Sequence, residues 1–271
     1  MNFDEKDVID YGMVCKHLDT KYIGRNYIYY DTIDSTNVQC KKQCSNKVIE
    51  GITVVAEEQS TGRGRLGRHW ESPKSTGIWM TIGLAPKVLP EMASKITIIA
   101  AAAVYKALKE LNIDCGIKWP NDIVINGKKI CGILTEMNTK ENEINYVVVG
   151  IGINVNMDCF PEELKEKATS LKKELGHKID RAELLGKVLN YFEKYYDLFK
   201  DSGDISLVNQ VCKKASVVIG KDVKIISRNE EILCRVVDID EDGQLIVRYE
   251  DNSIHKVFSG EVSVRGLYGY L

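Results

Sequence analysis

Apolar residues return every three or four positions in two long stretches of the chain, and this spacing predicts two amphipathic helices. The first stretch, residues 90–111, is rich in alanine, which favours a helix. The second, residues 181–200, follows Asp180, and Glu183 three positions later completes a pattern that resembles a capping box. Shorter helical patterns are expected at residues 8–18, 161–175 and 204–214.

Runs of β-branched and aromatic residues predict strands between and after these helices. In the longer part of the chain they lie at residues 27–33, 51–57, 78–84, 117–119, 123–125, 130–136 and 144–153. After residue 217 only strand patterns remain, at residues 223–226, 232–239, 244–249 and 253–258, with a hairpin turn signal at Asp242-Gly243. Helices and strands do not alternate regularly before this point, so we expect an α+β core on a mixed sheet, followed by a small β-barrel.

The change of pattern predicts three parts of the chain. Residues 1–23 form a helical lead-in, residues 24–214 a catalytic or binding domain, and residues 215–271 the small barrel domain. The acidic N-terminus does not resemble a secretion signal, and the longest weakly polar run, residues 96–105, is too short to span a bilayer. A cytoplasmic protein without a membrane segment is therefore expected.

Charge and cysteine content narrow the chemistry. The formal net charge is −2, so no field of the whole chain attracts nucleic acid, and any anion site must be local. The eight cysteines include no Cys-x-x-Cys pair, which argues against a zinc or redox site. Cys40 and Cys44 lie four residues apart on an expected helix, and free thiols are the simpler interpretation.

The strongest local signal is the loop Gly62-Arg63-Gly64-Arg65-Leu66-Gly67-Arg68-His69-Trp70. Glycine lets a backbone approach a ligand closely, and arginine presents planar donors that match phosphate and carboxylate oxygens. The pattern suits a loop that closes over a polyanion. It lacks the Gly-Lys-Ser/Thr ending of a P-loop, and no helix follows as a dinucleotide fingerprint requires. A nucleic-acid contact or a solvated loop is the alternative.

Three further segments carry candidate binding groups. Lys118-Trp119-Pro120-Asn121-Asp122 crowds polar side chains where proline ends a strand; Asn121 could bind a nucleotide, and Asp122 could hold Mg²⁺ or a ribose hydroxyl. Lysines 128 and 129 precede an apolar strand with Gly132 inside it, and glycines interrupt the apolar segment 147–156. Glycine within a strand marks close approach of a ligand or of another backbone. A strand-end turn, a charged hairpin and two crossing backbones are the plainer interpretations.

In this order the segments resemble the biotin protein ligase family. The matching positions are Ser35-Thr36-Asn37, Gln59, Gly62 to Trp70, Lys118 to Asp122, Lys129-x-x-Gly132, Ala168 to Leu171, and Gly150-x-Gly152-x-Asn154. The resemblance spans about residues 24–265. It implies a catalytic core of the class II synthetase-like biotin and lipoate ligase type, with an SH3-like barrel that helps to dock the acceptor.

The resemblance also implies a ligase reaction in two steps. The biotin carboxylate attacks the α-phosphate of ATP, and a lysine of a biotin carboxyl carrier protein or domain then takes the biotinyl group. Lys129, Arg63 and Arg65 are the expected catalytic groups, and Asp122 is expected to hold Mg²⁺. The expected binding residues for biotin and ATP are Ser35, Thr36, Asn37, Gln59, Gly62, Arg63, Gly64, Arg65, Arg68, Trp70, Asn121, Asp122, Lys129, Gly132, Leu134, Gly150, Ile153 and Asn154.

The sequence departs from the family pattern at two places, and two other functions compete with the ligase interpretation. The 34 residues before Ser35 are too few for the DNA-binding domain of repressor members, so no sequence-specific DNA binding is expected. Leu66 and His69 stand where other members often carry basic residues. A homodimer through an edge strand at residues 144–149 is allowed. A lipoate or octanoyl transfer enzyme and a non-catalytic nucleic-acid-binding module are the competing functions.

Overall fold

A seven-stranded mixed sheet forms the centre of the molecule. The computed structural model describes residues 7–46, 49–227, 230–260, 262–266 and 270. The sheet order is β1-β2-β3-β7-β6-β5-β4, with β1 and β2 parallel and every other neighbouring pair antiparallel. Its strands are β1 (Tyr27–Ile33), β2 (Ile52–Gln59), β3 (Gly77–Leu84), β4 (Gly116–Lys118), β5 (Asp122–Ile125), β6 (Lys128–Lys140) and β7 (Glu143–Asn154).

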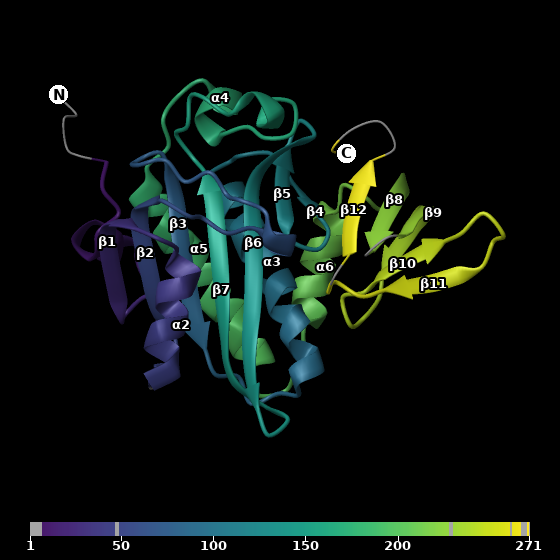
Figure 1. Ribbon diagram of the computed structural model, residues 1–271, viewed down its shortest axis with the longest axis horizontal. Helices are drawn as coiled ribbons and strands as arrows, with labels where there is room; N and C mark the ends of the chain where they lie inside the picture. Colours follow the sequence, from purple (N-terminus) through teal and green to yellow (C-terminus); the bar gives the residue numbers. More distant parts are fainter. Residues whose placement is uncertain (1–6, 47–48, 228–229, 261, 267–269, 271) are drawn as a thin grey trace.

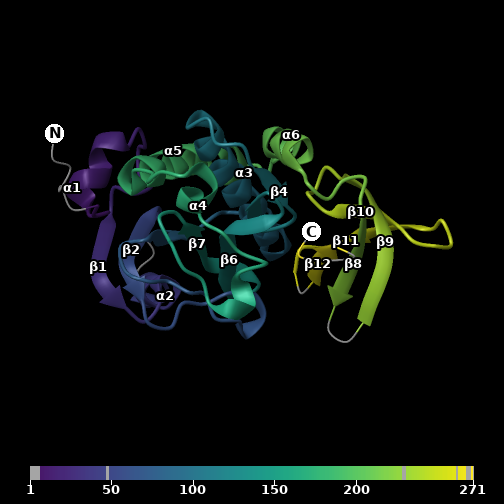
Figure 2. The same ribbon diagram turned by 90° about the horizontal axis from the view of Figure 1, so that it is seen from above.

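Helices cover both faces of this sheet (Figures 1 and 2). On one face lie α3 (Ser94–Glu110) and α5 (Arg181–Phe199), and on the other lies α2 (Thr36–Asn46). The predicted helices at residues 90–111 and 181–200 are therefore confirmed. The remaining helical segments are α1 (Tyr11–Val14), η1 (Cys15–His17), η2 (Arg65–Gly67), η3 (Pro90–Ala93), η4 (Glu162–Leu164), α4 (Leu171–Leu175) and α6 (Ser206–Ala215).

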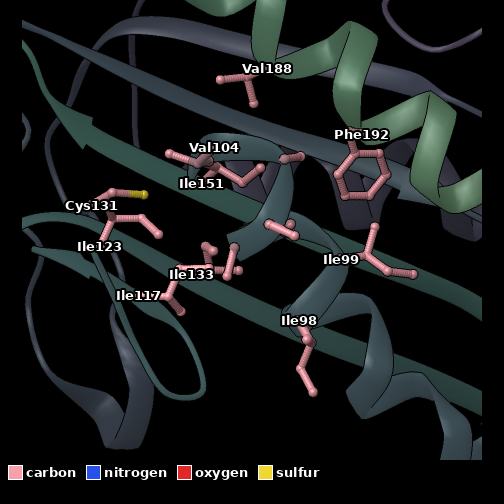
Figure 3. Close-up of a cluster of buried hydrophobic side chains, with 14 of the residues drawn as sticks. Ile98, Ile99, Val104, Ile117, Ile123, Cys131, Ile133, Ile151, Val188 and Phe192 are labelled. Carbon is pink, nitrogen blue, oxygen red and sulfur yellow. The ribbon is translucent and has the colours of Figure 1, made fainter. Parts of the chain in front are cut away.

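The main core fills the space between the sheet and the pair α3 and α5 (Figure 3). Ile151 and Ile153 of β7 point into this core, whereas Val148 packs on the opposite face against the α2 cysteines. Because side chains alternate along a strand, Gly150, Gly152 and Asn154 share the face of Val148. The expected ligand contact of Ile153 is wrong: its side chain is fully buried in the core.

The C-terminal residues form a separate five-stranded antiparallel sheet of order β11-β10-β9-β8-β12. Its strands are β8 (Asp222–Ser227), β9 (Glu230–Ile239), β10 (Leu245–Arg248), β11 (Ile254–Val257) and β12 (Val262–Gly266). An α+β core with a small β domain is confirmed, and β12 is a strand that the sequence pattern did not reveal. The division of the chain at residue 215 stays a prediction, although α6 ends there.

Two sequence-based expectations are wrong. Residues 161–175 do not form one helix, because the segment before α4 is extended and hydrogen-bonds to β6: Lys129 N–H donates to the Lys167 carbonyl, and Thr169 N–H donates to the Lys129 carbonyl. Residues 144–149 do not form an edge strand along their whole length, because β3 and β6 flank residues 147–149, whereas Ile144 and Tyr146 pair with β6 alone. A homodimer stays a prediction.

No helix in the described part of the chain is both long and apolar enough to cross a membrane.

Candidate active site

A cavity of about 460 Å³ opens on the α2 face of the sheet, within the size range of small-molecule sites. It is bounded by the loop after β2, the central strands, the segment before α4 and the C-terminal domain. Among the predicted residues its lining includes Ser35, Thr36, Asn37, Gln59, Arg63, Gly64, Arg65, Arg68, Trp70, Asn121, Asp122, Lys129, Gly132, Leu134, Gly150 and Asn154.

Glycines make room for this cavity on the central strands. A Cβ atom on Gly150 would lie 2.1 Å from Asn37 Oδ1, and one on Gly152 would lie 2.5 Å from the Trp70 indole nitrogen. On β6, a Cβ atom on Gly132 would lie 2.9 Å from Lys129 Nζ. Each contact is shorter than any packed side chain allows, so the glycines let these three functional side chains lie directly on the sheet.

One end of the cavity is a hydrogen-bonded polar network. Gln59 Oε1 accepts from both the Thr36 N–H and the Thr36 hydroxyl, at 2.8 and 3.0 Å. The Thr81 hydroxyl lies 2.8 Å from the Thr36 hydroxyl and 2.7 Å from Asn37 Oδ1. Asn37 Nδ2 donates to Glu136 at 2.8 Å. These buried and partly buried amides and hydroxyls are held in fixed orientations, which suits recognition of a polar ring.

The other end of the cavity is cationic. Arg65, Lys118 and Lys129 lie near Asp122 at this end. The lining of the whole cavity holds two carboxylates, Glu71 and Asp122, and seven lysine and arginine side chains: Arg63, Arg65, Arg68, Lys118, Lys129, Lys167 and Arg265. The charge of Arg63 acts on Glu136 of the polar network. The local excess of positive charge contrasts with the net charge of −2 of the whole chain. Such an excess of positive charge is what the predicted local anion site requires.

Lys129 lies between the two ends. Its ammonium is 2.5 Å from Asp122 Oδ1 and 5.0 Å from the centre of the Trp70 ring. Burial would raise the pKa of Asp122, but the charge and hydrogen bond of Lys129, together with a hydrogen bond from Tyr270, hold it below its usual value. A charged pair thus stands where the polar and cationic ends meet.

The arginine loop is hairpin-like rather than extended. Arg63 pairs with His69 as an antiparallel bridge, and the Trp70 N–H donates to the Gly62 carbonyl at 2.9 Å. Gly62 is outside the cavity lining. It is required by the turn, because a Cβ atom there would lie 2.2 Å from the Trp70 carbonyl oxygen. The side chains of Arg63 and Arg68 are exposed at the cavity mouth.

Arg65 joins this loop to the C-terminal domain. Its guanidinium donates to Asn121 Oδ1 at 2.8 Å and to the carbonyls of Ser259, Gly260 and Val262 at 3.1, 2.6 and 2.9 Å. Burial lowers the pKa of Arg65 from its ordinary value, but a guanidinium stays charged at physiological pH. This loop arginine therefore fixes one wall of the cavity to another.

Several lining residues had no clear sequence signal. The C-terminal domain contributes Ser263, Val264, Arg265 and Tyr270, and the segment before α4 contributes Phe160, Leu164 and Lys167. Lys118 is a polar neighbour of Asp122 in the sequence and is not among the expected binding residues. It is buried, and desolvation lowers its pKa to about 7. These residues line the cavity only through the folding of distant segments, the C-terminal domain and the segment before α4, against the central strands.

A metal ion held by protein side chains alone does not fit the site. No group of three or more His, Cys, Asp or Glu side chains suited to a metal occurs among the described residues. Asp122 offers one carboxylate, which suits a Mg²⁺ held mainly by phosphate oxygens and water, the usual arrangement in nucleotide sites.

Two family models match the chain. The model described as "Biotin/lipoate A/B protein ligase family" matches residues 29–154, and "Biotin protein ligase C terminal domain" matches residues 218–265. The chain is 38% identical over 250 residues to the bifunctional ligase/repressor BirA of Bacillus spizizenii, covering 91% of this chain and 76% of that protein. It is 31% identical over 224 residues to the biotin–[acetyl-CoA-carboxylase] ligase of Paracoccus denitrificans, covering 79% of this chain and 91% of that protein.

A solved structure agrees with these sequence matches. The biotin protein ligase of Aquifex aeolicus, in complex with biotin and ATP, superposes with a TM-score of 0.78 at 32% identity, covering 89% of this chain and 99% of that chain. With the identities and coverage above, the resemblance inferred from the ordered motifs is confirmed. The chain belongs to the biotin protein ligase family.

Proposed function

We propose that this chain activates biotin with ATP and then transfers the biotinyl group to a lysine of a carrier protein. A biotin carboxylate oxygen attacks the α-phosphorus of ATP, and pyrophosphate leaves as biotinyl-5′-AMP forms. The acceptor amine then attacks the activated carbonyl, loses a proton, and AMP departs. The observation that carries the proposal is one cavity with a fixed polar end and a cationic end, joined at Lys129.

The polar end suits the ureido ring of biotin. Thr36 and Gln59 are fixed by their mutual hydrogen bonds, and the buried Ser35 lies next to them. We assign these groups to the ring, and Gly132, Leu134, Gly150 and Asn154 to the walls around the rest of the molecule. The Trp70 indole N–H, buried and without a hydrogen-bond partner in the described structure, is free to donate to a ligand.

The cationic end suits the nucleotide phosphates. A carboxylate and a phosphate repel each other, and preorganised positive groups at their meeting point offset this repulsion in the transition state. We assign that role to the Lys129 ammonium, with Arg63, Arg65 and Arg68 neutralising the remaining phosphate charge. Asn121 is the proposed nucleotide contact beside Asp122. Bound Mg²⁺ supplies further charge neutralisation at the phosphates, and Asp122 is the carboxylate placed to hold it.

Biotin-dependent exchange of pyrophosphate into ATP tests the activation step. We expect exchange when both ATP and biotin are present, and none when lipoate replaces biotin at the same concentration. Because exchange needs only the first half-reaction, the result does not depend on the acceptor. Absence of exchange at saturating biotin rejects the proposal, and equal exchange with lipoate would show that the site does not select biotin.

The second step has its own readout. After incubation with ATP, Mg²⁺, biotin and a purified biotin carboxyl carrier domain, mass spectrometry should detect one biotinyl group on a single lysine. We propose that this reaction takes place in the cytoplasm.

Substitution of Gly150 tests the polar end. In Gly150→Ala the new methyl group would displace Asn37, whose hydrogen bonds to Glu136 and Thr81 would be lost. If this displacement of Asn37 weakens biotin binding by the equivalent of one buried hydrogen bond, the KM for biotin should rise by ~10-fold. Ile153→Val is the matched control on the same strand, because its side chain faces the core; its KM should equal the wild-type value. An unchanged KM in Gly150→Ala would mean that this face of β7 does not bind biotin.

A further inference from the structure

Tyr270 occupies the cationic end of the cavity. Its hydroxyl donates to Asp122 Oδ2, while its own carbonyl accepts from Lys118 Nζ at 2.7 Å. The Lys118 ammonium also lies 3.3 Å from the centre of the Tyr270 ring, and the guanidinium carbon of Arg265 lies 5.1 Å from it. One residue of the C-terminal segment thus contacts the buried carboxylate and two cations of the nucleotide end.

These contacts use the same atoms that a nucleotide needs. Asp122 has one carboxylate oxygen against Lys129 and the other against the Tyr270 hydroxyl. A hydrated Mg²⁺ or a ribose hydroxyl must take the place of one of them. Lys129 is the worse candidate for release, because its departure would leave a buried carboxylate without a charged partner.

Tyr270 is a weak partner for the cations around it. A carbonyl and an aromatic face are neutral, so they attract Lys118 and Arg265 without reducing the net positive charge of the cavity. A polyphosphate carries several negative charges and forms charge-assisted hydrogen bonds, which are stronger than bonds between neutral groups. Exchange of Tyr270 for phosphate oxygens is therefore favourable at Lys118 and Arg265, while a hydrated Mg²⁺ or a ribose hydroxyl takes the place of the Tyr270 hydroxyl at Asp122.

We propose that Tyr270 is a competing cap that sets the affinity for the nucleotide: its side chain and carbonyl fill the polyphosphate end in the free protein and leave when ATP binds. This inference rests on the proposed function and adds a residue to it. A conformation that must open before a ligand binds weakens the apparent affinity by the fraction of molecules that are open. Removal of the cap should therefore strengthen ATP binding.

Calorimetry with α,β-methylene-ATP, which cannot transfer its adenylyl group to biotin, tests the cap on the intact protein. Tyr270→Ala keeps the backbone carbonyl but removes the ring and the hydroxyl that hold the residue in place. If about nine molecules in ten are capped and the side chain holds the cap, this variant lowers the dissociation constant by ~10-fold. Tyr270→Phe keeps the ring on Lys118 but loses the bond to Asp122, so its dissociation constant should fall between the two. Tyr249→Ala, which removes a tyrosine that stacks on His255 in the same domain, should bind as the wild type does.

Two further probes locate the competition. Tripolyphosphate should bind more tightly to Tyr270→Ala than to the wild type, whereas the affinity for adenosine should be the same for both. Equal or weaker binding of α,β-methylene-ATP by both Tyr270 variants would overturn the cap. If the wild-type protein does not bind the ATP analogue, both the proposed function and the cap are rejected. If it binds the analogue and neither variant binds it more tightly, only the cap is rejected.

Discussion

Lys129→Ala lowers kcat/KM for biotin-dependent pyrophosphate exchange by about 100-fold, an increase of ~3 kcal/mol in the activation free energy. The ammonium stands 2.5 Å from Asp122, at the junction of the polar and cationic ends, where the biotin carboxylate and the α-phosphate are proposed to meet. Its charge matters most when the two anions approach, so kcat should fall as well as kcat/KM. Steady-state exchange with wild-type and variant protein measures both.

Two variants separate this charge from other effects. Lys129→Gln keeps a hydrogen-bond donor for Asp122 but has no charge, and it should lose nearly as much activity as the alanine variant. The neighbouring Lys128 points away from the cavity, donating to the Lys165 carbonyl at 2.9 Å and pairing with Glu166 at 3.7 Å. Lys128→Ala should therefore retain wild-type exchange. Activity within threefold of wild type in both Lys129 variants would remove this residue from the mechanism.

Arg181→Leu destabilises the folded protein by about 3–5 kcal/mol, the cost expected when one partner of a buried ion pair is removed. The Arg181 side chain is fully buried at the start of α5. It donates to Glu57 at 2.8 Å and to the Gly77 carbonyl at 2.9 Å, and it pairs with Asp7 at 2.8 Å. Without it, the nearly inaccessible Glu57 carboxylate has no cation beside it. Denaturant unfolding of both proteins measures the loss.

Two controls for this prediction use another residue of α5 and the partner of Arg181 in the buried ion pair, Glu57. Lys187 of α5 makes partly exposed ion pairs with Glu110 and Glu183, so Lys187→Ala should cost under about 1 kcal/mol. The double variant Arg181→Leu with Glu57→Leu removes both charges and should recover much of the loss. A loss below 1 kcal/mol in Arg181→Leu would mean that the buried pair does not stabilise the fold.

The Arg181 contacts also concern the active site. Glu57 lies two residues before Gln59 on β2, and Gly77 begins β3, so Arg181 binds both ends of the segment that carries the arginine loop. The Trp79 indole N–H donates to the carbonyls of Glu57 and Pro73 at 3.2 and 3.3 Å. The arginine loop therefore extends from a rigid base. The residues that hold this base together, such as Glu57 and Arg181, are far apart in the sequence.

The sequence alone determined the parts of this protein that depend on local pattern. Helical spacing located α3 and α5, and glycines in apolar runs marked the strand faces on which Asn37 and Trp70 lie. Most motif residues line one cavity, because each motif sits at a strand end or loop on the same side of the sheet. Such signals are readable because period and residue type act over a few neighbouring positions.

The tertiary structure decided what depends on partners distant in sequence. It placed β7 in the centre of the sheet, turned Ile153 to the core, and kept the segment before α4 extended through its bonds to Lys129. It also brought Tyr270 to Asp122 and the C-terminal carbonyls to Arg65. Strand order and domain closure follow from the packing of whole elements against one another, a quantity that no short window of sequence contains.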